Sequence, residues 1–190
     1  MYCVTLRHMK HTILIHGMPY KHEFYDVKIP SPSNSHWFPW IQKQLSLRDE
    51  VAQTLEMPRA FDPLYKDWVA VIENFKIDGE TTLIGHSCGG GFLLKYLSEH
   101  AELRPQKVVL VAPWLDPEKE ILNPFFDFTI DPTLTDRTDL HIFISSDDFA
   151  GCLASFEIIR KALPNAHWHE FTDREHFCTP EFPELLGALK

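Results

Sequence analysis

The chain has 190 residues, of which 44% are hydrophobic and 24% charged, so it suits one globular domain and is neither a disordered chain nor a fibre. Its formal net charge of −9, with no basic run, argues against nucleic acid as a partner, because phosphate binding needs a concentrated basic surface. No apolar run reaches the roughly 18 residues that cross a bilayer, so we expect no membrane segment. We therefore predict a single domain over residues 1–190.

Apolar runs and helical periods alternate along the chain. In chain order, the predicted strands cover 12–17, 51–58, 81–86, 107–115, 139–146 and 167–172. The predicted helices lie between and after them, at about 37–47, 61–75, 89–100, 152–164 and 182–190. The segment 24–30 is predicted to be a weaker strand or an ordered loop. Strands that alternate with helices in this way imply a mostly parallel sheet covered on both faces, a three-layer αβα sandwich.

The helix over 61–75 has a clear predicted start. Asp62 is placed to cap it, and Pro63 suits its first position. Trp68 and Ile72 then share one face, so we expect this helix to cover the sheet.

The cysteines and the N-terminus bear on cellular location. The four cysteines form no CxxC pair and have no regular spacing, which favours reduced thiols over a disulfide framework or a zinc finger. The first residues lack the build of a signal peptide, so we expect a cytoplasmic protein. Residues 1–8 precede the first predicted strand, and the sequence leaves open whether they are native or whether Met9 is the natural start.

A single serine lies between two glycines in the stretch Gly85-His86-Ser87-Cys88-Gly89. This GxSxG pattern joins a buried strand to a helix, which is the context of a nucleophile elbow. Neighbouring chain passes close to the positions two before and two after the serine, so only small residues fit there. The alternative is a tight turn that needs small residues and performs no chemistry.

A serine nucleophile needs a base, and the base needs an orienting acid. In this kind of fold the three follow in the order Ser, Asp or Glu, His, each after a strand. The strand over 139–146 is followed by Asp147 and Asp148, and the last strand is followed by His176. The sequence therefore places the missing residue types at two strand ends, in the required order.

With these motifs, the chain resembles the small serine hydrolases grouped around retinoblastoma-binding protein 9 and the bacterial YdeN-type proteins. The matching stretches are spread over nearly the whole chain: TILIHG, SHWFPWIQKQL, LEMP, LIGHSCGG, SSDD and EHFCTPEFPEL. The resemblance implies an α/β-hydrolase fold without a large lid domain. It assigns the nucleophile to Ser87, the acid to Asp148 and the base to His176. Phe149 departs from what usually follows the acid, so Asp147 remains the alternative acid.

Two further sets of residues complete the expected site. The oxyanion hole should combine the backbone N–H groups of Cys88 and Met18, the latter in the loop after the first strand. Aromatic residues in loops at the strand carboxyl ends are candidates for substrate binding, with core packing as the alternative for each: Trp37, Trp114, Phe149 and Phe177. The aromatic segment 123–134 is expected to form a short flap over the site or a patch for a partner.

These features predict a serine hydrolase that cleaves an ester, thioester or amide bond through an acyl-enzyme intermediate. We expect a carboxylesterase-like or aminoacyl ester or amide hydrolase acting on a small-molecule or peptide-like acyl substrate, with no cofactor. No metal is expected either, because the eleven histidines, including His167 and His169 on one strand face, show no ligand spacing. The rival is a non-catalytic protein-binding module that reuses the fold, with an unknown protein partner.

Overall fold

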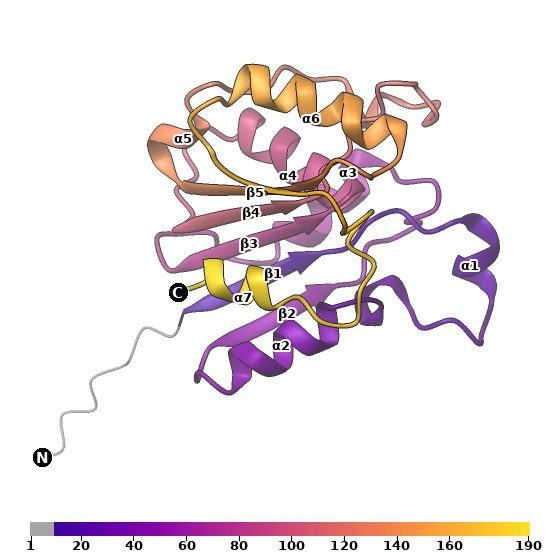
Figure 1. The fold of residues 1–190 in the computed structure, drawn as a ribbon, viewed down its shortest axis with the longest axis horizontal. Coiled ribbons are helices and arrows are strands. Elements are labelled where there is room, and N and C mark those ends of the chain that lie inside the picture. Colours follow the sequence, from indigo (N-terminus) through magenta and orange to yellow (C-terminus); the bar gives the residue numbers. More distant parts are fainter. Residues whose placement is uncertain (1–9) are drawn as a thin grey trace, which may run out of the picture.

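The computed structural model describes residues 10–190, so the question about residues 1–8 lies outside the described part (Figure 1). Six strands form one sheet in the order β2-β1-β3-β4-β5-β6, and every neighbouring pair is parallel. The strands are β1 (His11–Ile15), β2 (Val51–Leu55), β3 (Thr81–His86), β4 (Lys107–Val111), β5 (Asp139–Ser145) and β6 (His167–Phe171). All six predicted strands are present, and the predicted parallel sheet is confirmed.

Helices cover both faces of this sheet (Figure 1). One face carries α2 (Phe38–Ser46) and α7 (Pro183–Ala188), and the other carries α3 (Tyr65–Ile72), α4 (Cys88–Glu99) and α6 (Ala150–Ala162). The remaining helical turns are short: α1 (Lys21–Tyr25), η1 (Pro32–Asn34), η2 (Pro124–Phe126) and α5 (Leu134–Arg137). The predicted three-layer sandwich is therefore confirmed. Within residues 10–190 no connection between strands is large enough to form a lid domain, and no helix could cross a membrane.

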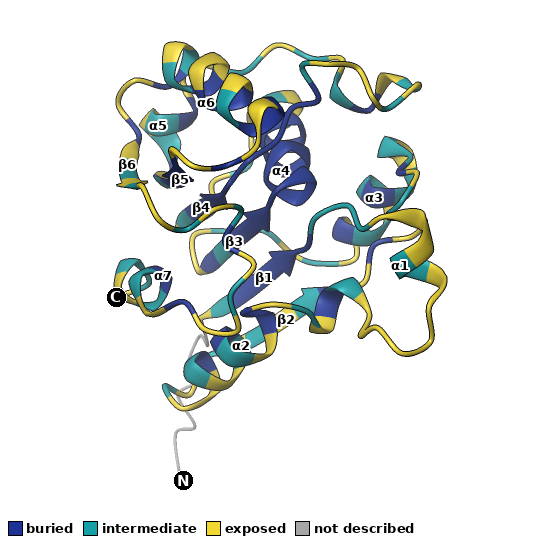
Figure 2. Cartoon of the chain, turned by 45° about the vertical axis from the view of Figure 1, so that its right-hand side comes forward, coloured by how far each residue is buried: buried dark blue, intermediate teal, exposed yellow. Residues whose placement is uncertain are grey.

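The helix α4 is buried along most of its length, as Figure 2 shows. Even Lys95 lies inside, where its ammonium group donates to the backbone oxygens of Pro124 and Asp127, at 3.1 and 3.3 Å. It also lies 4.1 Å from the ring centre of Tyr65. These partners replace the water that a buried cation loses.

The aromatic segment 123–134 packs on this helix. Phe125 is fully buried, with its ring centre 5.1 Å from that of Trp68. The segment expected as a flap or a partner patch is thus tied to the core at Phe125 and by the hydrogen bonds from Lys95.

Two local expectations can be compared with the structure. Of the two alternatives for the segment 24–30, the strand is wrong and the loop is confirmed, since the chain leaves α1 at Tyr25 and continues as turns. The helix predicted from Asp62 begins only at Tyr65, because Leu64 has an extended backbone. Asp62 instead forms an ion pair with Arg59 across a turn, which takes up the carboxylate that was expected to cap the helix.

Candidate active site

Ser87 occupies a strained corner between β3 and α4. Its φ of 54° and ψ of −122° are rare for a residue with a side chain. The backbone N–H of Ser87 donates to the carbonyl of Val111, and its own carbonyl accepts from the N–H groups of Gly90, Gly91 and Trp114. The corner is therefore fixed by β4, by the first turn of α4 and by the segment after β4.

Three glycines make this corner possible. A Cβ atom on Gly85 would lie 2.6 Å from the carbonyl oxygen of Gly89, and one on Gly89 would lie 2.4 Å from that of Ile15. A Cβ atom on Gly17 would lie 2.9 Å from the Cβ of Ser87. These distances confirm that only glycine fits two residues before and two after the serine, and they bring the end of β1 against Ser87.

Asp148 and His176 form a hydrogen-bonded pair at the same edge of the sheet. Nδ1 of His176 lies 3.0 and 3.1 Å from the two carboxylate oxygens of Asp148. The carboxylate side chain is completely buried, and it also accepts from the N–H of Phe149 at 2.8 Å. Because a carboxylate only accepts, Nδ1 carries a proton and donates it, which leaves Nε2 as the basic nitrogen of the neutral ring.

Asp147 has a different set of contacts. Its Oδ1 accepts from the Ser145 hydroxyl and from the backbone N–H of Glu175, the latter at 2.9 Å. These hydrogen bonds lower the pKa of the Asp147 carboxyl group. They also hold the loop before and after His176, in which Glu175 and Phe177 have positive φ values of 46° and 56°. Of the two adjacent aspartates, one therefore contacts the imidazole and the other supports its loop.

His86 links that loop to the serine corner, a contact that sequence reasoning missed. Its Nε2 lies 2.8 Å from the backbone oxygen of His176, and the two ring centres are 4.9 Å apart. Burial lowers the pKa of His86 well below its ordinary value, with a further contribution from His176, so the ring is neutral and donates through Nε2–H. The only signal in the sequence was a histidine placed inside the GxSxG stretch, directly before the serine. The hydroxyl of Ser87 itself takes part in none of the side-chain hydrogen bonds found among residues 10–190.

Cys152 is the second residue that sequence reasoning missed. Its Sγ lies 3.7 Å from Nδ1 of His176 and 3.7 Å from the carbonyl oxygen of Ala112. Burial, with Asp148 nearby, raises the pKa of this thiol, so it stays protonated. Cys152 thus fills the space beneath the acid and imidazole pair as a small neutral group.

The loop after β1 is also held beside Ser87. His16 lies between two backbone groups: its Nδ1 is 2.7 Å from the Gly17 oxygen, and its Nε2 accepts from the N–H of Met57 at 3.0 Å. The backbone N–H groups of Met18 and Cys88 donate none of the hydrogen bonds found in the described part of the chain. Neither N–H group is therefore taken up by another acceptor within residues 10–190.

The four aromatic candidates for substrate binding differ in burial. Trp37, Trp114 and Phe177 are almost completely buried. Phe149, by contrast, is 49% exposed, and its ring centre lies 4.9 Å from that of His176. The packing alternative accounts for the three buried rings, and Phe149 is the one of the four that a bound molecule can reach directly.

Comparison with known proteins relates the chain to serine hydrolases. The model of the family described as serine hydrolase matches residues 30–156, a span that contains Ser87 and Asp148 and ends before His176. The putative hydrolase YdeN of Bacillus subtilis is 30% identical, over 61% of this chain and 65% of YdeN, slightly less than two thirds of that protein. The serine hydrolase RBBP9 of Rattus norvegicus is 26% identical, over 81% of this chain and 84% of RBBP9.

Solved structures show the same fold. The ydeN gene product from B. subtilis superposes with a TM-score of 0.79 and 24% identity, covering 95% of this chain and 97% of that one. Est1E from Butyrivibrio proteoclasticus superposes with a TM-score of 0.64 and 15% identity, covering 95% and 85%. The chain has an α/β-hydrolase fold without a large lid and belongs to the serine hydrolase family.

Proposed function

We propose that this protein hydrolyses an ester, thioester or amide bond with Ser87 as nucleophile, His176 as base and Asp148 as acid. The observation that carries the proposal is the hydrogen bond from His176 to the buried carboxylate of Asp148. His86, the residue before the strained Ser87, contacts the backbone oxygen of His176 and so links the two parts of the site. Nucleophilic catalysis needs a serine fixed in position and an imidazole held in one tautomer, and the positive φ of Ser87 and the Asp148–His176 bond support these two roles.

The reaction runs in two halves. Nε2 of His176 takes the proton of Ser87 as the serine oxygen attacks the acyl carbon, and the same nitrogen then protonates the leaving group. The N–H groups of Cys88 and Met18 stabilise the oxyanion, each by about 3 kcal/mol. Water, deprotonated by His176, then attacks the acyl-enzyme, and Ser87 recovers its proton. Asp148 keeps the imidazole oriented and stabilises its cation throughout.

The exposed ring of Phe149 supports a hydrophobic acyl or leaving group, because it offers apolar surface directly beside His176. The substrate class proposed is a small-molecule or peptide-like acyl compound, and the activity is carboxylesterase-like or aminoacyl ester or amide hydrolysis. No cofactor takes part in the steps above.

A fluorophosphonate probe, which phosphonylates activated serines, tests the proposal directly. The wild type should be labelled, the Ser87→Ala variant should not, and Ser46→Ala, a change at an exposed serine, should behave as the wild type. A panel of p-nitrophenyl esters and aminoacyl amides then identifies the preferred bond. A folded wild type that shows no Ser87-dependent labelling and cleaves no member of the panel would leave the non-catalytic binding module as the better account.

A further inference from the structure

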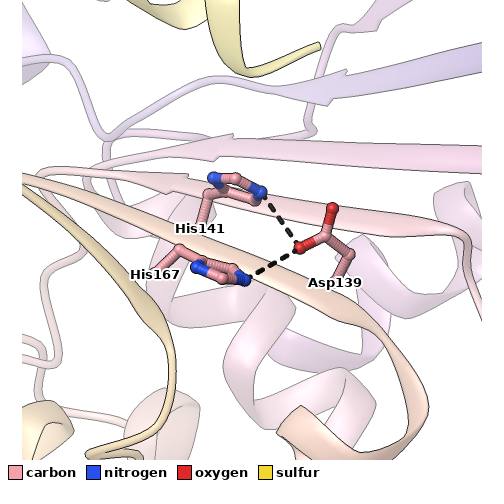
Figure 3. Close-up of side chains that lie close together, drawn as sticks. All are labelled: Asp139, His141 and His167. Carbon is pink, nitrogen blue, oxygen red and sulfur yellow. Dashed lines mark ion pairs between the residues drawn. The ribbon is translucent and has the colours of Figure 1, made fainter. Parts of the chain in front are cut away.

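A second cluster of ionisable side chains lies at the opposite edge of the sheet, where β5 and β6 begin (Figure 3). Asp139 and His141 are two residues apart on β5 and therefore point to the same face. His167 opens β6 and is the register partner of His141. Phe143, two residues further on that face, contacts Phe182 next to α7, so the cluster lies on the side of the sheet that α7 covers.

We propose that Asp139, His141 and His167 bind a divalent transition metal ion of the Zn²⁺ type, at a site separate from Ser87. Oδ1 of Asp139 lies 3.0 Å from Nε2 of His141 and 3.5 Å from Nε2 of His167, as the dashed lines of Figure 3 mark. Two ligands about 2.0–2.1 Å from a zinc ion at tetrahedral angles lie about 3.3 Å apart. The two distances bracket that value, and one ligand atom from each of the three residues fits within 4.8 Å of the others.

His169 supplies an outer partner for this site. Its Nε2 lies 2.9 Å from Nδ1 of His141, and its ring is stacked on Phe143 with the centres 4.1 Å apart. When Nδ1–H of His141 donates to His169, the lone pair of Nε2 is left pointing toward Asp139. Metal-binding histidines are commonly oriented in this way, by a hydrogen bond from the other ring nitrogen.

The exposure of the ligands permits an ion to enter. The side chains of Asp139 and His167 are 41% and 65% exposed, whereas that of His141 is only 13% exposed. Small rotations of the two outer residues can therefore close the site around an ion held first by His141. Water then fills the fourth position of a tetrahedral site.

The positive charge of Lys107 lies next to the proposed site and should weaken metal binding. Its replacement therefore gives a test of the site. Its ammonium group lies 3.0 Å from Oδ2 of Asp139 and 3.4 Å from Nε2 of His141. A cation at that distance repels a metal ion and competes for the same carboxylate. Removing this charge without removing a ligand should therefore strengthen metal binding.

A bound ion would join β5 to the edge strand β6 and stabilise the sheet. Ser87, Asp148 and His176 lie at the other ends of the strands, so the ion would not take part in hydrolysis. The expected readouts are therefore metal affinity and thermal stability, and neither depends on the proposed activity.

Calorimetric titration of the full chain with ZnCl₂, and the visible absorption of bound Co²⁺, test the site. We expect one equivalent to bind, with affinity reduced about tenfold or more in His167→Ala and in Asp139→Asn. Both changes are at exposed side chains, and His22→Ala, at an exposed histidine on α1, is the matched control. Lys107→Met should bind more tightly than the wild type.

The cluster of Asp148, Cys152 and His176 is the main competing site, because its three ligand atoms also lie within 4.8 Å of one another. Binding that survives His176→Ala and is lost in His167→Ala supports the proposal. At ZnCl₂ concentrations about 100-fold above the dissociation constant, the melting temperature should rise by about 5–10 °C. Failure of the wild type to bind, or unchanged binding in both His167→Ala and Asp139→Asn, would mean that the cluster is a hydrogen-bond network only.

Discussion

The two ends of the parallel strands carry the same pair of side chains, a histidine and an aspartate, in different settings. We call the end with Ser87, Asp148 and His176 the carboxyl edge, and the end with Asp139, His141 and His167 the amino edge. At the carboxyl edge, His176 contacts Asp148 at 3.0 Å, and at the amino edge His141 contacts Asp139 at 3.0 Å. The Asp148 side chain is fully buried, whereas the Asp139 side chain is 41% exposed and also contacts Lys107. An imidazole and a carboxylate at hydrogen-bond distance therefore do not identify a catalytic site by themselves.

Backbone strain separates the two edges further. The carboxyl edge contains Ser87, Glu175 and Phe177 at positive φ, whereas the residues of the amino-edge cluster all lie in regular strands. Strained positions persist only where the surrounding structure fixes them, and they gather at functional sites. The difference supports the proposal of nucleophilic chemistry at the carboxyl edge and of metal binding at the amino edge.

Substitution of the aspartates at the two edges should produce the largest difference in kcat. Asp148→Asn should lower kcat by about 10⁴-fold. An amide in contact with Nδ1 no longer favours the tautomer of His176 that has its proton on Nδ1 and a basic Nε2. Asp139→Asn should leave kcat unchanged, since it lies at the other edge. Asp147→Asn, which weakens the hydrogen bonds of the loop, should give an intermediate loss, and steady-state kinetics on a p-nitrophenyl ester measures all three. Equal losses for Asp147→Asn and Asp148→Asn would contradict the assignment of the acid.

The packing of the carboxyl edge can be tested with one extra methyl group. Gly89→Ala should destabilise the protein by about 3 kcal/mol, because its Cβ would lie 2.4 Å from the backbone oxygen of Ile15, which cannot move aside. Gly79→Ala, just before β3 at the amino edge, meets nothing within 4 Å and should be neutral or stabilising by about 0.4–1 kcal/mol. Urea denaturation gives both values. A Gly89→Ala variant as stable as the wild type would show that the corner can relax.

The role of His86 should be visible as a smaller kinetic effect. His86→Phe removes the N–H that donates to the His176 carbonyl, so we expect kcat to fall about tenfold with little change in KM. His86→Gln retains an N–H donor and should recover part of the loss, which a purely structural role would not predict. At the amino edge, His141→Gln should leave kcat as it is. If His86→Gln and His86→Phe lose the same activity, the hydrogen bond is not what orients the base.

Chelation should have the smallest effect on activity. Prolonged treatment with EDTA should leave ester hydrolysis unchanged, because no step at Ser87 uses the amino-edge ion. The same treatment of zinc-loaded protein should return the melting temperature to that of the metal-free chain. If EDTA abolished hydrolysis and added Zn²⁺ restored it, the ion would take part in catalysis. That result would contradict the separation of the two edges into a catalytic site and a metal site.

Much of the carboxyl edge followed from the sequence alone. The alternation of apolar strands with helices predicted the parallel sheet, and the glycines around Ser87 predicted the sharp turn. Both depend on local periodicity and local sterics, which short stretches of sequence carry. The order in which Ser87, Asp148 and His176 follow their strands also placed them at one edge, because parallel strands all end on the same side.

Only the tertiary structure decided the remaining points. It showed that Asp148 contacts the imidazole while Asp147 supports the loop, that Phe149 is open while Trp37 and Phe177 are buried, and that α3 begins later than predicted. It also brought Asp139 into contact with His141 and His167. These results depend on strand register, on the turns that aim each side chain and on packing between distant segments, and none of these is encoded within a short stretch of the chain.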